Sequence, residues 1–258
     1  MTDPHAYEYS IESVENAART LLMLREKPSI RAVDVATELG VARSTAHRMV
    51  STLAQSGLLR RDDNDKSYRA GYALVELGMA VIGAADIRSE VGPSLASLAA
   101  STGETTHFLV REGHDVLFVS VAEGTHVIRA VPRVGTRLPA HVTSAGRCIL
   151  AAMPRSEVSA LYPAGQRLRG GTDRAFTSTA QLTRDLDDVA AQGFAVNRSQ
   201  SEPGLTAVSV AIRDARGSAL GAISVSGPTD RIDPAVDAIV EALQSEVQRL
   251  EGALARGT

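Results

Sequence analysis

One stretch of basic and hydroxyl side chains has the composition of a surface that reads DNA. Residues 42–56 have helical spacing, and the expected inward residues are Ala46, Met49, Val50 and Leu53. The opposite face holds only hydrogen-bond donors and short polar groups, namely Arg43, Ser44, Thr45, His47 and Arg48. Exposed helices usually mix both charge signs, and this face has no acid. The pattern favours a helix that enters the major groove of double-stranded DNA.

The segment that follows predicts a basic hairpin. Residues 58–71, LLRRDDNDKSYRAG, read as two extended pieces around a polar turn. Its cations are Arg60, Arg61, Lys66 and Arg69. We expect these four side chains to add salt-sensitive affinity for the DNA backbone rather than to specify bases. The alternative is a helical module that binds another protein, which predicts no salt-dependent DNA affinity.

Two further helices complete a winged helix-turn-helix. Residues 11–26 place Ile11, Val14, Ala18, Leu21 and Leu22 at helical spacing. Residues 30–39 read as a short second helix that ends at Gly40, and Gly57 ends the third. The expected DNA-binding domain therefore spans residues 10–71.

A second group of small polar side chains lies on two expected strands near the C-terminus. In AISVSG, residues 222–227, Ser224 and Ser226 share one face because side chains alternate along a strand. Ala207 and Ser209 share a face of the preceding strand. Such a strip suits either a small pocket with few hydrogen bonds or the solvated face of a half-exposed sheet. The sequence leaves both interpretations open.

A helix expected at 143–153 begins among small residues, TSAG, with Thr143 or Ser144 as its N-cap. Its first N–H groups are open to an anion such as a carboxylate. A hydrolase that uses Ser144 and Cys148 is an alternative, but Cys148 lies in apolar CILAAM and is expected to pack as a small hydrophobe. The chain lacks the G-x-S-x-G, Walker and dinucleotide motifs. We therefore expect no enzyme activity.

Four histidines lie in or near expected strands, at positions 107, 114, 126 and 141. They leave a metal-responsive regulator as a further alternative. No pair has the i,i+4 spacing of a zinc-binding helix, and the chain has one cysteine. Solvated or hydrogen-bonded histidines are the simpler interpretation, so no metal or cofactor is expected.

Composition favours two globular domains. The 258 residues are 44% hydrophobic and 22% charged, with a net charge of −3, and basic residues outnumber acidic ones only over residues 11–70. Neither a long apolar run nor a signal sequence is present, so we expect a cytoplasmic protein. A linker helix is expected at 72–86, before an α+β domain at 87–258.

The expected order in the second domain alternates helices with strands around a mostly antiparallel sheet. Helices are expected at 87–102, 143–153, 179–192 and 231–255, the last with Asp233 as N-cap and Pro234 at N1. Strands are expected at 104–112, 115–123, 126–132, 193–197, 205–214 and 218–227.

Several of these segments, in order, resemble IclR-type transcriptional regulators. They are AVDVATELGVARSTAHRMVSTLAQSGLLRR, LPAHVTSAGRCILAAM, EPGLTAVSVAIRDARG and AISVSGPTDRID, and the resemblance runs from about residue 10 to the C-terminus. It implies a winged helix joined to a GAF-like effector domain, in homodimers or dimers of dimers on palindromic operators. It also implies an effector held by Ser144, Ala145, Gly146, Asn197, Ala207, Ser224 and Ser226.

Two of these positions depart from the family pattern. Relatives that bind small oxo-acids tend to have an acidic residue where Asn197 stands and a cysteine where Ala207 stands. The smaller, apolar Ala207 suggests a roomier pocket for a larger organic acid, although the 3% aromatic content argues mildly against a stacked aromatic ligand. We expect a ligand-responsive repressor or dual regulator of a catabolic operon that senses a small organic acid.

Overall fold

The computed structural model describes residues 11–62, 65–83 and 87–255. The chain divides into two compact units, residues 1–85 and 86–258. Residues 63 and 64 of the expected polar turn lie outside the described part. Among the helices that are described, none combines the length and the apolar character that a bilayer crossing needs.

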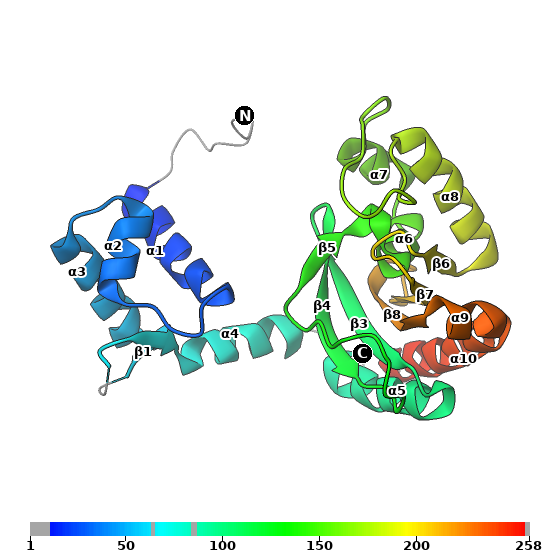
Figure 1. The fold of residues 1–258 in the computed structure, drawn as a ribbon, viewed down its shortest axis with the longest axis horizontal. Helices are drawn as coiled ribbons and strands as arrows, with labels where there is room; N and C mark the ends of the chain where they lie inside the picture. Colours follow the sequence, from blue (N-terminus) through cyan, green and yellow to red (C-terminus); the bar gives the residue numbers. More distant parts are fainter. Residues whose placement is uncertain (1–10, 63–64, 84–86, 256–258) are drawn as a thin grey trace. The chain divides into compact units, whose positions relative to one another are not determined.

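The first unit consists of helices and a two-stranded hairpin (Figure 1). Its elements are α1 (Glu12–Leu22), a 3-10 turn (Met23–Arg25), α2 (Ala32–Leu39), α3 (Arg43–Gln55), β1 (Leu59–Arg61), β2 (Tyr68–Ala70) and α4 (Tyr72–Gly83). As expected, α2 ends at Gly40, which has a left-handed φ of 68°. The core forms where α2 and α3 pack against the hairpin, around Val35, Val50 and Leu59. The predicted winged helix is confirmed.

Most of the apolar face expected on the first helix stays outside this core, and of its five expected residues only Leu21 packs against it. Ile11, Val14 and Leu22 are 68%, 62% and 52% exposed. The buried residues of α1 are Asn16 and Thr20, and the Thr20 hydroxyl donates to the Asn16 carbonyl at 2.8 Å. The local hydrogen bond satisfies the Thr20 hydroxyl as it faces inward, while Ile11, Val14 and Leu22 remain at the surface.

The second unit is built on a six-stranded antiparallel sheet in the order β5-β4-β3-β8-β7-β6. The strands are β3 (Thr105–Glu112), β4 (Asp115–Ala122), β5 (Arg137–Pro139), β6 (Ala195–Arg198), β7 (Leu205–Arg213) and β8 (Ala219–Pro228). The α+β class expected from the sequence is confirmed.

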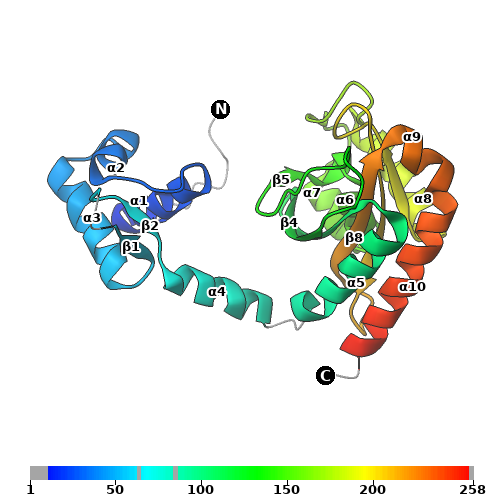
Figure 2. The same cartoon turned by 60° about the horizontal axis from the view of Figure 1, so that its bottom comes forward.

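Helices cover both faces of the sheet (Figure 2). On one face, α5 (Ile87–Thr102) packs on β3 and β4, and α10 (Val236–Leu254) packs on β7. On the other, α6 (Ser144–Ala151) packs on β7 and β8, and α8 (Thr179–Gln192) packs against α6. The remaining short helices are α7 (Arg155–Leu161), α9 (Thr229–Ile232) and two 3-10 turns at Ala140–Val142 and Asp233–Ala235. Of these, α7 was not predicted from the sequence.

The serine-bearing strands are therefore buried on both faces. Ser209, Ser224 and Ser226 are 0%, 5% and 5% exposed. Of the two interpretations left open by the sequence, the solvated sheet face is wrong. The α6 layer covers the serine side of these strands, so their hydroxyls lie in the interior.

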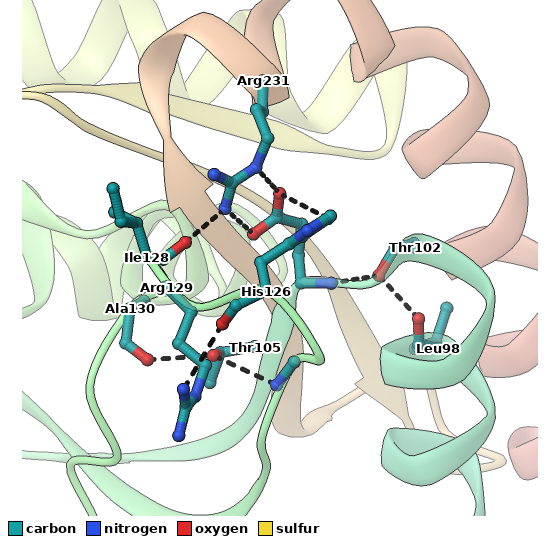
Figure 3. Close-up of polar contacts among 10 residues, drawn as sticks. Leu98, Thr102, Thr105, His126, Ile128, Arg129, Ala130 and Arg231 are labelled. Carbon is teal, nitrogen blue, oxygen red and sulfur yellow. Dashed lines mark hydrogen bonds and ion pairs between the residues drawn. The ribbon is translucent and has the colours of Figure 1, made fainter.

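Residues 126–132, expected to be a strand, have no regular structure. Their backbone groups bond to side chains instead of a neighbouring strand (Figure 3). The Thr105 hydroxyl donates to the Ala130 carbonyl at 2.9 Å, and Arg231 donates to the Ile128 carbonyl at 2.7 Å. The short β5 occupies that edge of the sheet.

The closing helix also starts later than expected. A short α9 and a 3-10 turn precede α10, whose N-cap is Ala235. Asp233 does not cap the helix, and its carboxylate instead accepts from Arg198 Nε at 3.1 Å. Pro234 accordingly lies in the 3-10 turn and not at the first position of the long helix.

Candidate functional site

A pocket lies where the start of α6 faces β3, β7 and β8. It is a narrow cavity with a volume of about 40 Å³. All but one of the seven residues that the family resemblance assigned to an effector line it, namely Ser144, Ala145, Asn197, Ala207, Ser224 and Ser226. Gly146 is the exception.

Strand register brings the pocket's small polar residues together. Ser224 pairs with His107 on β3 and with Ser209 on β7, while Ala207 pairs with Ser226 and with Asn197. Paired residues on antiparallel strands project to the same face. The side chains therefore form one surface across the four adjacent strands β3, β8, β7 and β6, under the first turn of α6.

The first turn of α6 places two backbone donors at this pocket. Thr143 is the N-cap, and its hydroxyl accepts the Gly146 N–H at 3.0 Å. The Ser144 hydroxyl bonds to that of Ser209 at 2.7 Å. Within the described residues, the Ser144 and Ala145 N–H groups have no partner. The positive end of the helix therefore offers two donors to an anion.

Gly146 has a packing role in this turn. A Cβ at this position would overlap the backbone of Ala140 in the preceding 3-10 turn. The absence of a side chain lets the start of α6 lie against that turn, which fixes the height of the two free N–H groups above the sheet.

Asn197 is already hydrogen-bonded by its own surroundings. Its amide nitrogen donates to the Val142 carbonyl at 3.0 Å and to the Ser201 hydroxyl at 2.8 Å, and its oxygen accepts the Gln200 N–H at 2.8 Å. Both donors of the amide are therefore used. Its contacts shape the wall of the pocket formed by β6 and the segment after it.

The serines differ in what they leave free. The Ser226 hydroxyl donates to the Thr105 carbonyl at 3.3 Å. The Ser224 hydroxyl has no hydrogen-bond partner among the described residues. Ser224 is therefore the serine whose hydroxyl remains available inside the pocket.

Sequence reasoning missed two pocket residues of a different kind, His107 and Arg133. His107 is 2% exposed, packs edge-on to Phe118, and its Nε2 atom has no partner in the described part of the chain. Burial, helped by the nearby Arg133, lowers the pKa of His107 to about 4, so the ring is neutral at pH 7. From the sequence alone, His107 is only a candidate metal ligand. Its place in the pocket could not be predicted, because the other lining residues come from strands far away in the chain.

The structure gives no support to the two alternatives, a metal site and a hydrolase that uses Ser144 and Cys148. Among the described residues, no group of three or more His, Cys, Asp or Glu side chains is arranged to hold a metal ion. Cys148 is buried, its S–H donates to the Ser209 carbonyl at 3.0 Å, and burial raises the pKa of this thiol to about 12. A protonated, enclosed thiol is not a nucleophile.

The expected DNA-binding residues are all at the surface of the first unit. Arg43, Ser44, Thr45, His47 and Arg48 are exposed on α3, and Arg60, Arg61, Lys66 and Arg69 are exposed on or beside the hairpin. Two of the hairpin cations have local partners. Arg69 pairs with Asp62 at 3.4 Å, and Arg60 lies over the Tyr72 ring at 5.8 Å.

Known proteins match both units. A family model described as the IclR helix-turn-helix domain matches residues 13–63, and one described as the C-terminal part of the bacterial transcriptional regulator IclR matches residues 79–251. The regulator XynR of Escherichia coli is 30% identical over 247 residues, covering 95% of this chain and 96% of that protein. The glycerol operon regulatory protein of Streptomyces coelicolor is 29% identical and covers 86% of this chain and 87% of its own length.

A solved structure of similar fold has a ligand bound. It is an IclR homologue from Microbacterium hydrocarbonoxydans complexed with 4-hydroxybenzoate, with a TM-score of 0.79 and 27% identity over 95% of this chain and all of that one. The relatives are DNA-binding regulators rather than enzymes. The chain therefore belongs to the IclR family and is a DNA-binding transcriptional regulator.

Proposed function

We propose that the protein represses, or both represses and activates, a catabolic operon in response to a small organic acid. The observation that carries this is the pocket under α6, where free backbone donors, the Ser224 hydroxyl and His107 Nε2 line one cavity. The two N–H groups suit a carboxylate. The serine and the neutral imidazole suit an uncharged polar group on the same molecule. 4-Hydroxybenzoate, the ligand in the structure of one relative, has both a carboxylate and an uncharged hydroxyl group.

The DNA-reading role is assigned to residues 10–71. Here α3 enters the major groove, with Arg43 and Arg48 placed to read bases and the hairpin cations on the backbone. Residues 72–86 connect this domain to the effector domain at 87–258. A protein of this kind acts in the cytoplasm, where its operator is.

The proposed assembly is a homodimer, or a dimer of dimers, on a palindromic operator. Its support is the exposed apolar stripe of α1, formed by Ile11, Val14 and Leu22. A two-fold interface uses the same patch on both subunits, so the stripe of one copy would be covered by the same stripe of the second copy. Two recognition helices related in this way require a palindromic site.

Effector binding and DNA binding are coupled in this proposal. A coupling free energy of about 1–3 kcal/mol changes operator affinity about 5- to 150-fold. The coupling is reciprocal, so operator DNA changes effector affinity by the same factor. Effector affinity measured with and without one operator duplex therefore tests the coupling, and no other target gene needs to be known.

The test is fluorescence anisotropy of the full chain on duplex DNA from upstream of its own gene, with a scrambled duplex as control, across a salt series. We expect preference for the upstream duplex, weakening steeply with salt, and a changed affinity when an organic acid is added. Equal, weak binding of both duplexes would contradict autoregulation, and a genome-wide pull-down would then locate the operator. An effect from neutral compounds alone would contradict an acid effector.

A further inference from the structure

Arg133 and Glu202 form an ion pair beside the pocket. Arg133 lies in the segment between β4 and β5 and lines the pocket, with its side chain 17% exposed. Glu202 lies in the segment between β6 and β7, with its side chain 44% exposed, and accepts from the Arg133 guanidinium through Oε1. Their chain neighbours Ala130 and Ser201 also line the pocket. The pair therefore joins two walls of the cavity.

The charges around the pocket are one-sided. Of the described residues that line it, Arg133 is the only one with a formal charge at pH 7, because His107 is neutral there. No carboxylate lines the pocket in the described part of the chain. The acid that balances Arg133 approaches from outside the lining, on a more exposed side chain. The arrangement has a cation facing inward and its counter-ion facing solvent.

We infer that Arg133 selects an acidic effector and that Glu202 is a resident counter-ion which the effector's carboxylate replaces. The inference rests on the proposed organic-acid function and assigns the residue that determines the charge of the ligand. A carboxylate beside Arg133 adds charge-assisted hydrogen bonds to those offered by the Ser144 and Ala145 N–H groups. The effector's carboxylate would lie inside the pocket, a more enclosed place than that of the Glu202 carboxylate. Solvent screens a charge pair less in such a place.

The exchange is favourable because the resident pair is weak. Half-exposed ion pairs contribute little, since water competes for both charges. The planar guanidinium of Arg133 can bind a carboxylate through two parallel hydrogen bonds. A neutral ligand obtains neither benefit and leaves Glu202 in place. The pair therefore discriminates acids from their uncharged analogues.

Two variants separate this role from a structural one. Arg133→Gln removes the cation, and Glu202→Gln removes only the competing charge. Arg129→Gln is the matched control, since Arg129 is an exposed cation of the same segment that pairs with Glu123 at 2.6 Å and does not line the pocket. A purely structural pair predicts that both Arg133→Gln and Glu202→Gln weaken ligand binding. A counter-ion exchange predicts opposite effects.

The experiment is isothermal titration of the full chain with acetate, lactate, pyruvate, benzoate and 4-hydroxybenzoate, each beside its amide. We expect the tightest acid to bind at least about tenfold more tightly than its amide, a difference of about 1.4 kcal/mol. Arg133→Gln should remove most of that difference. Glu202→Gln should tighten the acid by about two- to fivefold, as expected for loss of a weak pair, and leave the amide unchanged. Arg129→Gln should behave as wild type.

The outcomes distinguish this inference from the function on which it rests. The role of the pair would be overturned if an acid bound the Arg133→Gln variant as tightly as wild type, or bound the Glu202→Gln variant more weakly than wild type. Either result would leave the proposal of an acid effector intact. Binding of amides in preference to acids, or of no acid in the series, would count against both. Circular dichroism and operator binding of each variant show whether the fold is retained, and the expected gain in Glu202→Gln is not a result that misfolding produces.

Discussion

Ser224 on β8 lies directly opposite His107 on β3, and both are buried in the pocket lining. Within the described residues, His107 Nε2 is a buried atom without a hydrogen-bond partner, and the Ser224 side chain borders the same pocket. Unpaired buried polar groups cost folding free energy and are rare in native proteins. The unpaired His107 ring, in one cavity with Ser224 on the adjacent strand, supports the proposed effector site.

The first prediction concerns the serines. Ser224→Ala should weaken effector binding without destabilising the fold, since its hydroxyl makes no internal bond, and adding Ser226→Ala should abolish the effector response. Operator affinity without effector should not change. Titration calorimetry and anisotropy measure the two properties. Ser218→Ala, in the exposed turn between β7 and β8, is the control. Loss of operator binding in the double variant would contradict a separable sensor.

The second prediction concerns α3 and the hairpin. Arg48→Ala should weaken operator binding by about 1–3 kcal/mol and reduce the preference over scrambled duplex, because a base contact is lost. Arg61→Ala should weaken both duplexes equally and lower the salt slope by about one. Anisotropy across a salt series separates the two effects. Arg25→Ala, an exposed cation of the 3-10 turn after α1, should change neither.

The third prediction concerns the exposed stripe of α1. Val14→Asp should convert the proposed dimer to a monomer, because a charge on each subunit would be buried in the shared interface. Sedimentation velocity gives the oligomeric state. Ser13→Asp, on the exposed part of the same helix, should leave the dimer intact. An unchanged dimer in Val14→Asp would place the interface elsewhere.

The fourth prediction concerns acid stability. The pKa of His107 lies at about 4 in the folded protein, below its ordinary value of 6.5, mainly because of burial. Between these two pH values the unfolded chain binds more protons than the folded one, so stability falls as pH falls through this window and the loss ends near pH 4. The contribution is about 3 kcal/mol at most.

His107→Asn should flatten part of that dependence in chemical denaturation measured from pH 4 to pH 7. His141, whose pKa burial also lowers, keeps some of the slope. His114→Asn, at an exposed position, is the control and should follow wild type. If His107→Asn and wild type had equal pH profiles, the folded His107 would not be neutral.

The fifth prediction concerns the Glu104 carboxylate, whose side chain is 4% exposed. Arg231 donates to both of its oxygens, at 2.5 and 2.9 Å, and also holds the Ile128 carbonyl. Arg231→Gln should lower the melting temperature, because a buried carboxylate loses its main partner. Arg129→Gln, which removes a more exposed ion pair, should lower it less. Equal melting temperatures of the two variants would contradict a structural role for the Glu104 pair.

The sequence predicts the elements whose signals are local. The helix ends at Gly40 and Gly57 and an N-cap at Thr143 or Ser144 follow from residue type, because backbone conformation and the first hydrogen bonds of a helix depend on near neighbours. The structure decides for Thr143. The strand at 126–132 was predicted wrongly for the complementary reason. Its composition suits a strand, but side chains from Thr105 and Arg231 bond its carbonyls, and no local pattern encodes those partners.

The same division applies to the site. Alternation along single strands placed Ser224 and Ser226 on one face, and small residues located the start of α6. Only the tertiary structure decided that this face is buried, since α6 folds over it, and that His107 and Arg133 complete the lining. It also decided which face of α1 is covered. Strand register and layer packing depend on contacts between residues far apart in the chain, and their energies are not encoded in any short segment.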